Sequence, residues 1–215
     1  MTRPYLLLSP SAEEEFAHLP KASDSDPYDS VIVGLHESSL SYIDLNIAFR
    51  ILKSEPISFS STSKAKRKPI LIAPHTSMFQ QSPATDDLPA GLSLGIGPFV
   101  RALEVAGGWE AEIVGKPTRR FFEMAIERIK ANHPDAGEIE PEDVGVVGDD
   151  VVNDLGEGTR DLCLKRILGM YICIQDNGAN ISAVRTGKYR EGVEKTDHPA
   201  DRVYDSFADF VHDLV

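Results

Sequence analysis

Short apolar runs alternate along the chain with longer segments in which apolar residues recur at helical spacing. Because the runs are continuously apolar rather than alternating with polar residues, they are typical of buried strands in a parallel sheet. Strand followed by helix, repeated along the chain, predicts an α/β fold. The predicted strands are residues 5–8, 30–35, 69–74, 111–115 and 144–150, and the predicted helices are 12–16, 42–52, 99–108, 118–132 and most of 151–167.

Local signals place several boundaries of these elements. Ser11 is predicted to cap the helix that begins with residues 12–16, and Gly107 and Gly108 are predicted to stop the helix before them. Two polar stretches interrupt the alternation of strand and helix, the serine- and lysine-rich residues 58–69 and residues 80–91. Both are predicted to be surface loops.

The composition restricts the classes of partner. A formal net charge of −12 and a pI of about 4.9 argue against a general nucleic-acid-binding protein, which would present a basic face. No apolar run approaches the length of a membrane span, so no membrane partner is expected. The two cysteines, Cys163 and Cys173, form no CxxC pair, and a reducing, cytoplasmic location is the expectation.

An acidic cluster follows the last predicted strand. Asp149 and Asp150 come directly after the apolar run, and Asp154 lies four residues, or one helical turn, beyond Asp150. Ligands of parallel α/β sheets gather at the carboxyl ends of the strands, and adjacent carboxylates repel unless a cation compensates. Mg²⁺ is the natural candidate because it prefers oxygen ligands. The alternative is that these aspartates only cap the segment that follows.

A lysine follows the preceding predicted strand. Lys116 comes directly after Gly115, and Pro117 stands near the start of the next helix. By itself Lys116 is an ordinary solvated lysine. One strand-end lysine followed by a crossover and a strand-end acidic cluster, however, suits a phosphate held between a fixed cation and a metal ion.

The residues of these two sites resemble the haloacid dehalogenase (HAD) superfamily. The resemblance rests on the sequences GKPTRRFFEMAI (115–126), VGVVGDDVVNDLGEG (144–158) and VRTGKYREGVE (184–194). It implies a parallel-sheet, HAD-like (Rossmannoid) partial core over residues 98–215 and an α/β cap domain over residues 1–97. Residues such as LIAPHT (71–76) and LSLGIGPFVRALE (92–104) resemble the cap and its return to the core.

The resemblance also implies an activity and roles for individual residues. It implies a Mg²⁺-dependent phosphohydrolase that acts on a small phosphorylated compound or pyrophosphate through an aspartyl-phosphate. Lys116 matches the catalytic lysine that holds the phosphate and the nucleophile, and Asp149 matches the aspartate that coordinates magnesium. Asp150 and Asp154 match its acidic neighbours, which act through water or hydrogen bonds. A homodimer is a further expectation from the resemblance.

Two departures from the family pattern accompany these matches. No DxDGT-like segment, which would carry the nucleophilic aspartate, occurs in the sequence, so we expect the chain to be inactive alone. The alternative is a non-catalytic remnant, or the product of an imperfect gene model, that acts only by protein–protein association. In addition, residues 169–182 interrupt the pattern before VRTGKYR, which we interpret as a translated intron.

Overall fold

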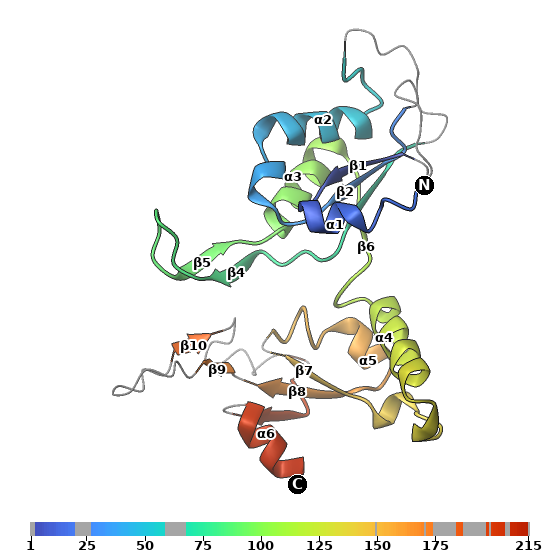
Figure 1. Cartoon of the computed structure of the whole chain (residues 1–215), viewed down its shortest axis with the longest axis vertical. Coiled ribbons are helices and arrows are strands. Elements are labelled where there is room, and N and C mark those ends of the chain that lie inside the picture. Colours follow the sequence, from blue (N-terminus) through green and yellow to red (C-terminus); the bar gives the residue numbers. More distant parts are fainter. Residues whose placement is uncertain are drawn as a thin grey trace. The chain divides into compact units, whose positions relative to one another are not determined.

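The computed structural model describes residues 3–19, 27–58, 68–148, 150–169, 171–173, 184–186, 197, 199–204 and 207–214 (Figure 1). The chain divides into two compact units. Unit 1 comprises Met1–Phe79 and Leu94–Val114, and unit 2 comprises Gln80–Ser93 and Gly115–Val215. The division into compact units does not show which unit is the cap and which is the core. The assignment of residues 1–97 to the cap and 98–215 to the core therefore stays a prediction.

Unit 1 contains a four-stranded sheet in the order β1-β2-β3-β6. The strands are β1 (Pro4–Leu7), β2 (Ser30–Val33), β3 (Ile70–Ala73) and β6 (Glu112–Ile113). Every neighbouring pair is parallel, with Leu7 opposite Val33 and Ala73 opposite Ile113. The parallel α/β sheet that continuous apolar runs predict is therefore confirmed.

Helices connect these strands, and their ends follow the local sequence. They are α1 (Pro10–Glu14), the 3-10 helix η1 (Glu37–Ser39), α2 (Tyr42–Leu52) and α3 (Gly97–Gly107). The residue Gly108 ends α3 in the left-handed conformation with φ 68°, which glycine adopts without strain. The predicted cap of α1 was wrong by two residues. Ser9 accepts the backbone N–H of Ala12, because Pro10 occupies the first helical position and Ser11 already lies inside the helix.

The core of unit 1 lies between the sheet and helices α2 and α3. Val31 and Val33 of β2 and Leu71 of β3 are almost completely buried. They pack with Leu52 of α2 and Val100 of α3. The residues predicted as strands thus form the sheet side of one apolar core, and the amphipathic helices close it.

The predicted loop over residues 80–91 is a hairpin in the structure. Strands β4 (Phe79–Ser82) and β5 (Gly91–Leu94) pair as a two-stranded sheet, so only the residues between them form a loop. β4 contains the exposed residues Gln80 and Gln81 and therefore lacks the apolar pattern that predicts a buried strand. A two-stranded ribbon has little core against which apolar side chains could pack. The other predicted loop, residues 58–69, falls mostly outside the described residues.

Unit 2 contains a three-stranded parallel sheet in the order β11-β8-β7. Its strands are β7 (Gly145–Gly148), β8 (Lys165–Gly169) and β11 (Arg202–Tyr204). A separate antiparallel pair joins β9 (Tyr171–Cys173) to β10 (Val184–Thr186). The helical elements are α4 (Arg119–Asn132), η2 (Pro134–Ala136), η3 (Pro141–Asp143), α5 (Glu157–Asp161) and α6 (Phe207–Leu214).

The prediction that residues 151–167 are mostly helix was wrong. The helix α5 covers only Glu157–Asp161, and β8 begins at Lys165. Glycines at 156 and 158 weaken a continuous helix, and Cys163 has a positive φ of 56°, which helical residues do not adopt. Of the predicted intron, 169–182, only Gly169 and Tyr171–Cys173 belong to the described residues, in β8 and β9.

Among the described helices, none combines the length and the apolar content that crossing a membrane requires.

Candidate functional site

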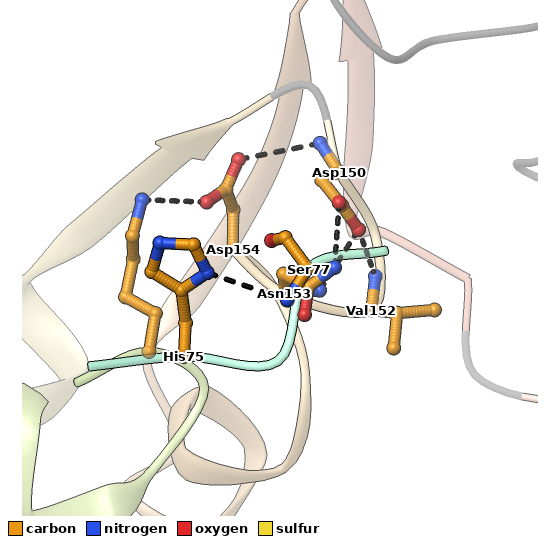
Figure 2. Close-up of polar contacts among 7 residues, drawn as sticks. His75, Ser77, Asp150, Val152, Asn153 and Asp154 are labelled. Atoms are coloured by element: carbon orange, nitrogen blue, oxygen red, sulfur yellow. Dashed lines mark hydrogen bonds and ion pairs between the residues drawn. The ribbon is translucent and has the colours of Figure 1, made fainter. Parts of the chain in front are cut away.

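The acidic segment after β7 forms a tight turn that Asp150 caps. Its Oδ1 accepts the backbone N–H groups of Val152, at 3.1 Å, and Asn153, at 2.9 Å (Figure 2). Its Oδ2 accepts the side-chain amide of Asn153 at 2.7 Å, and its carbonyl oxygen accepts the N–H of Asp154 at 2.8 Å. The capping alternative that the sequence left open therefore describes what Asp150 does in this structure.

Asp154 lies between two donors at the end of this turn. One carboxylate oxygen accepts the Lys116 ammonium at 2.6 Å. The other accepts the N–H of Asp150 at 3.3 Å (Figure 2). The side chain of Asp154 is 16% exposed and that of Lys116 is 46% exposed. Charge-assisted hydrogen bonds are stronger than neutral ones, so this partly buried pair fixes the lysine against the turn.

The last residue of β7 makes room for Asp154. A Cβ atom on Gly148 would lie 2.4 Å from the Cβ of Asp154 and 2.8 Å from its Oδ2. No side chain fits at those distances, so glycine at 148 allows the carboxylate to pack against the strand end. This close approach explains why a glycine is required at position 148, which its sequence context did not reveal.

A second tight loop presents Lys116. The hydroxyl of Thr118 donates to the carbonyl oxygen of Gly115 at 2.7 Å and accepts the N–H of Phe121 at 3.4 Å. Thr118 is thereby the N-cap of α4. The peptide bond between Lys116 and Pro117 is cis.

The two loops are joined where α5 begins. The N–H of Gly158 donates to the carbonyl oxygen of Pro117 at 2.8 Å. A Cβ atom on Gly158 would lie 2.4 Å from that oxygen, and one on Gly156 would lie 2.1 Å from the carbonyl oxygen of Val152. The start of α5, which follows the acidic turn, is therefore in direct contact with the loop that carries the lysine.

The structure brings together three of the four residues that the sequence singled out. Lys116, Asp150 and Asp154 meet at the ends of these loops, and Asp149 lies outside the described residues. Sequence reasoning missed Asn153 and the glycines at 148, 156 and 158. The signal for Asn153 was its position three residues after an aspartate that starts a turn.

Protein donors already bind the two described carboxylates of this acidic cluster. Within the described part of the chain, no group of three His, Cys, Asp or Glu residues could hold a metal. Oδ1 of Asp150 already accepts two backbone N–H groups, which occupy both of its lone pairs. Asp154 is paired with an ammonium group that would repel a cation on the same carboxylate. Both residues suit contact with a metal through water.

A second polar contact follows β3 in unit 1. Nδ1 of His75 accepts the backbone N–H of Ser77 at 3.3 Å, and Ser77 is buried (Figure 2). This bond puts the proton of the neutral ring on Nε2. It fits the structural role that an isolated histidine most often has.

No protein-family model matches the chain. Curated proteins do match it. The chain is 33% identical over 197 residues to the phospholysine phosphohistidine inorganic pyrophosphate phosphatase of Xenopus laevis, covering 92% of this chain and 56% of that protein. For the Homo sapiens protein of the same name the identity is 31%, with coverages of 97% and 61%. Haloacid dehalogenase-like hydrolase domain-containing protein 2 of Homo sapiens is 32% identical, with coverages of 92% and 58%. The chain thus spans less than two thirds of the length of these relatives.

Solved structures share the fold at low sequence identity. A 4-nitrophenylphosphatase from Thermotoga maritima aligns with a TM-score of 0.65 and 20% identity, over 98% of this chain and 65% of that one. NagD from E. coli K-12 aligns with a TM-score of 0.58 and 16% identity, over 95% and 64%. A glycerol phosphate phosphatase from Mycobacterium tuberculosis in complex with magnesium aligns with a TM-score of 0.56 and 21% identity, over 78% and 42%. These likenesses confirm the predicted α/β fold class.

Proposed function

Since the chain belongs to the haloacid dehalogenase superfamily, we propose that it carries the phosphate-binding part of a Mg²⁺-dependent phosphohydrolase. The substrate class is a small phosphorylated compound or pyrophosphate. Two relatives that match over most of this chain are named as inorganic pyrophosphate phosphatases, and the structural neighbours include phosphatases of small phosphate esters.

The observation that carries the proposal is the placement of Lys116. Its side chain is nearly half exposed, and its ammonium is anchored on one side by Asp154. A lysine ammonium has three N–H donors, and within the described part of the chain Asp154 is the acceptor that it contacts, so two donors are left for an anion. A fixed cation at a loop between a strand and a helix is suited to binding phosphate oxygens.

Catalysis of phosphoryl transfer depends mainly on the positions of the reacting groups and on stabilisation of the charge on the phosphoryl group. Lys116 would bind a phosphate oxygen and stabilise the charge that grows on the transferring group. The turn capped by Asp150 and the loop capped by Thr118 would hold the lysine rigidly, because each backbone is fixed by short hydrogen bonds.

Magnesium is the proposed cofactor, with Asp149 as the direct ligand and Asp150 and Asp154 as neighbours that act through water. A bound magnesium ion would neutralise phosphate charge. The donor sets of Asp150 and Asp154 support this division, because protein donors already bind both carboxylates.

The covalent step of this proposal needs an aspartate that the sequence does not offer in a DxDGT-like segment. We therefore propose that the 215-residue chain binds phosphate but does not turn over phosphate esters by itself.

Calorimetric titration of the purified chain with inorganic phosphate, in millimolar Mg²⁺, tests this proposal. We expect measurable binding that Lys116→Met weakens about tenfold, the equivalent of about 1.4 kcal/mol. Lys68→Met is the matched control, because Lys68 belongs to unit 1, where its ammonium lies 3.5 Å from the centre of the Trp109 ring. Equal affinities for wild type and Lys116→Met would refute the phosphate site.

A parallel assay measures hydrolysis of pyrophosphate and p-nitrophenyl phosphate. We expect no turnover above the uncatalysed rate. Robust turnover that Asp149→Ala abolishes would show that the chain contains a nucleophile of its own, and would contradict the proposed inactivity while supporting the metal ligand.

A further inference from the structure

We propose that the loop around His36 binds the ammonium group of a small organic amine, with the Nε2 lone pair of the His36 ring as the acceptor. The loop connects β2 to α2 and belongs to unit 1. Lys116 and the acidic turn belong to unit 2. Failure of the phosphate site would therefore leave this amine site untouched.

Two hydrogen bonds fix the position of the proton on the His36 ring. The hydroxyl of Ser39 donates its one proton to the carbonyl oxygen of Leu8 at 2.8 Å. The same hydroxyl oxygen lies 2.8 Å from Nδ1 of His36 and can only accept there, so Nδ1 carries the ring proton. The neutral ring therefore has its lone pair on Nε2.

The protonated Nδ1 excludes another use of this ring. The exposed hydroxyl of Ser38 lies 3.2 Å from Nδ1, which resembles a nucleophile beside its base. A nitrogen that already carries a proton cannot take one from a hydroxyl group, so His36 does not activate Ser38. A metal site has no support either, because no group of three His, Cys, Asp or Glu residues in the described part of the chain could hold a metal.

The acceptor lies at the edge of the unit 1 sheet where the parallel strands end. β1 and β2 are parallel, so the loops that follow them, with Leu8 and His36, lie at the same edge. The N–H of Gly34 donates to the carbonyl oxygen of Leu7 at 2.8 Å, and Ser39 joins the loops again. The His36 side chain is half-buried, and none of the described residues donates to its Nε2. Ligands of parallel α/β sheets gather at this edge.

The charges of the surrounding elements favour a cation. Residues 4–19 and 27–49, which form β1, α1, β2, η1 and most of α2, contain six acidic residues and no lysine or arginine. The exposed Glu37 follows His36 directly, and Glu13 lies in the first turn of α1. These acids would repel a phosphate or a carboxylate. An ammonium group has N–H donors for Nε2 and a charge that the acids attract.

Nitrogen-15 NMR of the imidazole rings tests the protonation of His36. We expect the neutral ring of the wild type to carry its proton on Nδ1. Ser39→Ala removes the acceptor for that proton and should shift the ring towards the form protonated on Nε2, whereas Ser39→Thr keeps the hydroxyl and should restore the wild-type form. A neutral wild-type ring protonated on Nε2 would overturn the proposal.

Titration with n-butylamine tests the ligand, and the amide resonances of Gly34 and Ser39 report its binding. We expect saturable binding that His36→Phe weakens about tenfold or more, because a hydrogen bond to a charged group is lost. Neutral n-butanol should bind at least about fivefold more weakly than the amine. The control is His18→Phe, since the exposed His18 ring also donates from Nδ1, to the carbonyl oxygen of Glu15 at 2.7 Å. Equal affinities for wild type and His36→Phe, or for the amine and the alcohol, would overturn the proposal.

Ser39→Ala supplies a second binding test that leaves the His36 ring in place. A ring protonated on Nε2 cannot accept a hydrogen bond there, so the affinity for n-butylamine should fall as that form becomes more populated. Ser39→Thr should recover the affinity together with the wild-type form of the ring. An affinity that stays constant while the proton moves would show that Nε2 is not the acceptor.

Discussion

The two units of the chain are stabilised by different kinds of contact. In unit 1, side chains from β2, β3, α2 and α3 form one apolar cluster whose members are almost completely buried. In unit 2, the apolar cluster of the described residues is centred on Phe122, Ile126 and Leu164. The loops of unit 2 are held instead by carboxylates, caps and glycines, as at Asp150, Thr118 and Gly148.

This difference separates the part that folds by burial from the part that presents polar groups. The stability of an apolar core changes little when an exposed side chain at its edge is replaced, but falls strongly when a buried side chain loses volume. The stability of loops that are fixed by hydrogen bonds and close backbone contacts depends on single atoms at particular positions. The following predictions test this contrast, in order of decreasing expected effect on the free energy of unfolding.

The largest effect is expected in the core of unit 1. Leu71 is 1% exposed, and Leu71→Ala should lower the free energy of unfolding by about 2–5 kcal/mol because it leaves a cavity. Urea unfolding followed by the fluorescence of Trp109, the only tryptophan of the chain, measures this loss. The control is Ile70→Ala on the same strand, where the side chain is 41% exposed and a cost below about 1 kcal/mol is expected. Similar costs for the two variants would mean that burial does not dominate this unit.

A single added methyl group should be costly at the end of β7. Gly148→Ala should lower the free energy of unfolding by about 1–3 kcal/mol, because the new carbon collides with Asp154. The control on the same strand is Gly145→Ala, whose new carbon would lie 3.4 Å from Ile167, and a change within about 0.5 kcal/mol is expected. Chemical denaturation followed by circular dichroism compares the two. A harmless Gly148→Ala would contradict the packing described for Asp154.

Loss of the cap on α4 should have a moderate effect. Thr118→Ala removes the oxygen that accepts the N–H of Phe121, at an expected cost of about 1 kcal/mol. Thr118→Ser keeps that oxygen and should recover most of the loss. Thermal unfolding of the two variants measures this difference. Equal melting temperatures would show that the Thr118 cap does not stabilise unit 2.

The smallest effect concerns a polar contact inside unit 1. Burial first, and then the negative charge of Asp44 and a hydrogen bond to it, raise the pKa of Tyr5 to about 12. The fold therefore favours the neutral phenol. The contribution of Tyr5 to the free energy of unfolding is complete below the pKa of an unfolded tyrosine, about 10. It is lost as the pH rises towards 12, and the expected loss is about 1 kcal/mol after solvent screening.

Urea unfolding at a series of alkaline pH values measures that loss. Tyr5→Phe should flatten the dependence of stability on pH above about 10, because the group that ionises is gone. Tyr42→Phe, at a side chain that is 83% exposed, should leave the dependence as in wild type. A steep alkaline loss that survives in Tyr5→Phe would assign it to another group.

Much of the fold was predictable because buried parallel strands have a simple signature. The runs that became β1, β2, β3 and β7 are continuously apolar, and α2 begins and ends where its spacing of apolar residues predicts. The β4–β5 hairpin was missed since exposed glutamines carry no such signature. The length of α5 was missed because glycines at 156 and 158 serve close backbone contacts that only the folded chain reveals.

The candidate site was predictable in its members but not in its contacts. Strand ends and charge pointed to Lys116, Asp150 and Asp154, which the structure brings together. Sequence alone left open whether the acids cap a turn or face a cation, because both uses require the same residues at the same spacing. Whether they also support a metal at Asp149 stays a prediction.

The contact between Pro117 and Gly158 has a consequence for how this region can evolve. Gly148 packs against Asp154, and Gly158 donates a backbone hydrogen bond to Pro117. Because these contacts fix the backbone on both sides of the acidic turn, we expect that an insertion or a deletion between them would break one of the contacts. Side chains at its exposed positions, such as Val152, are free to vary, while its length is not.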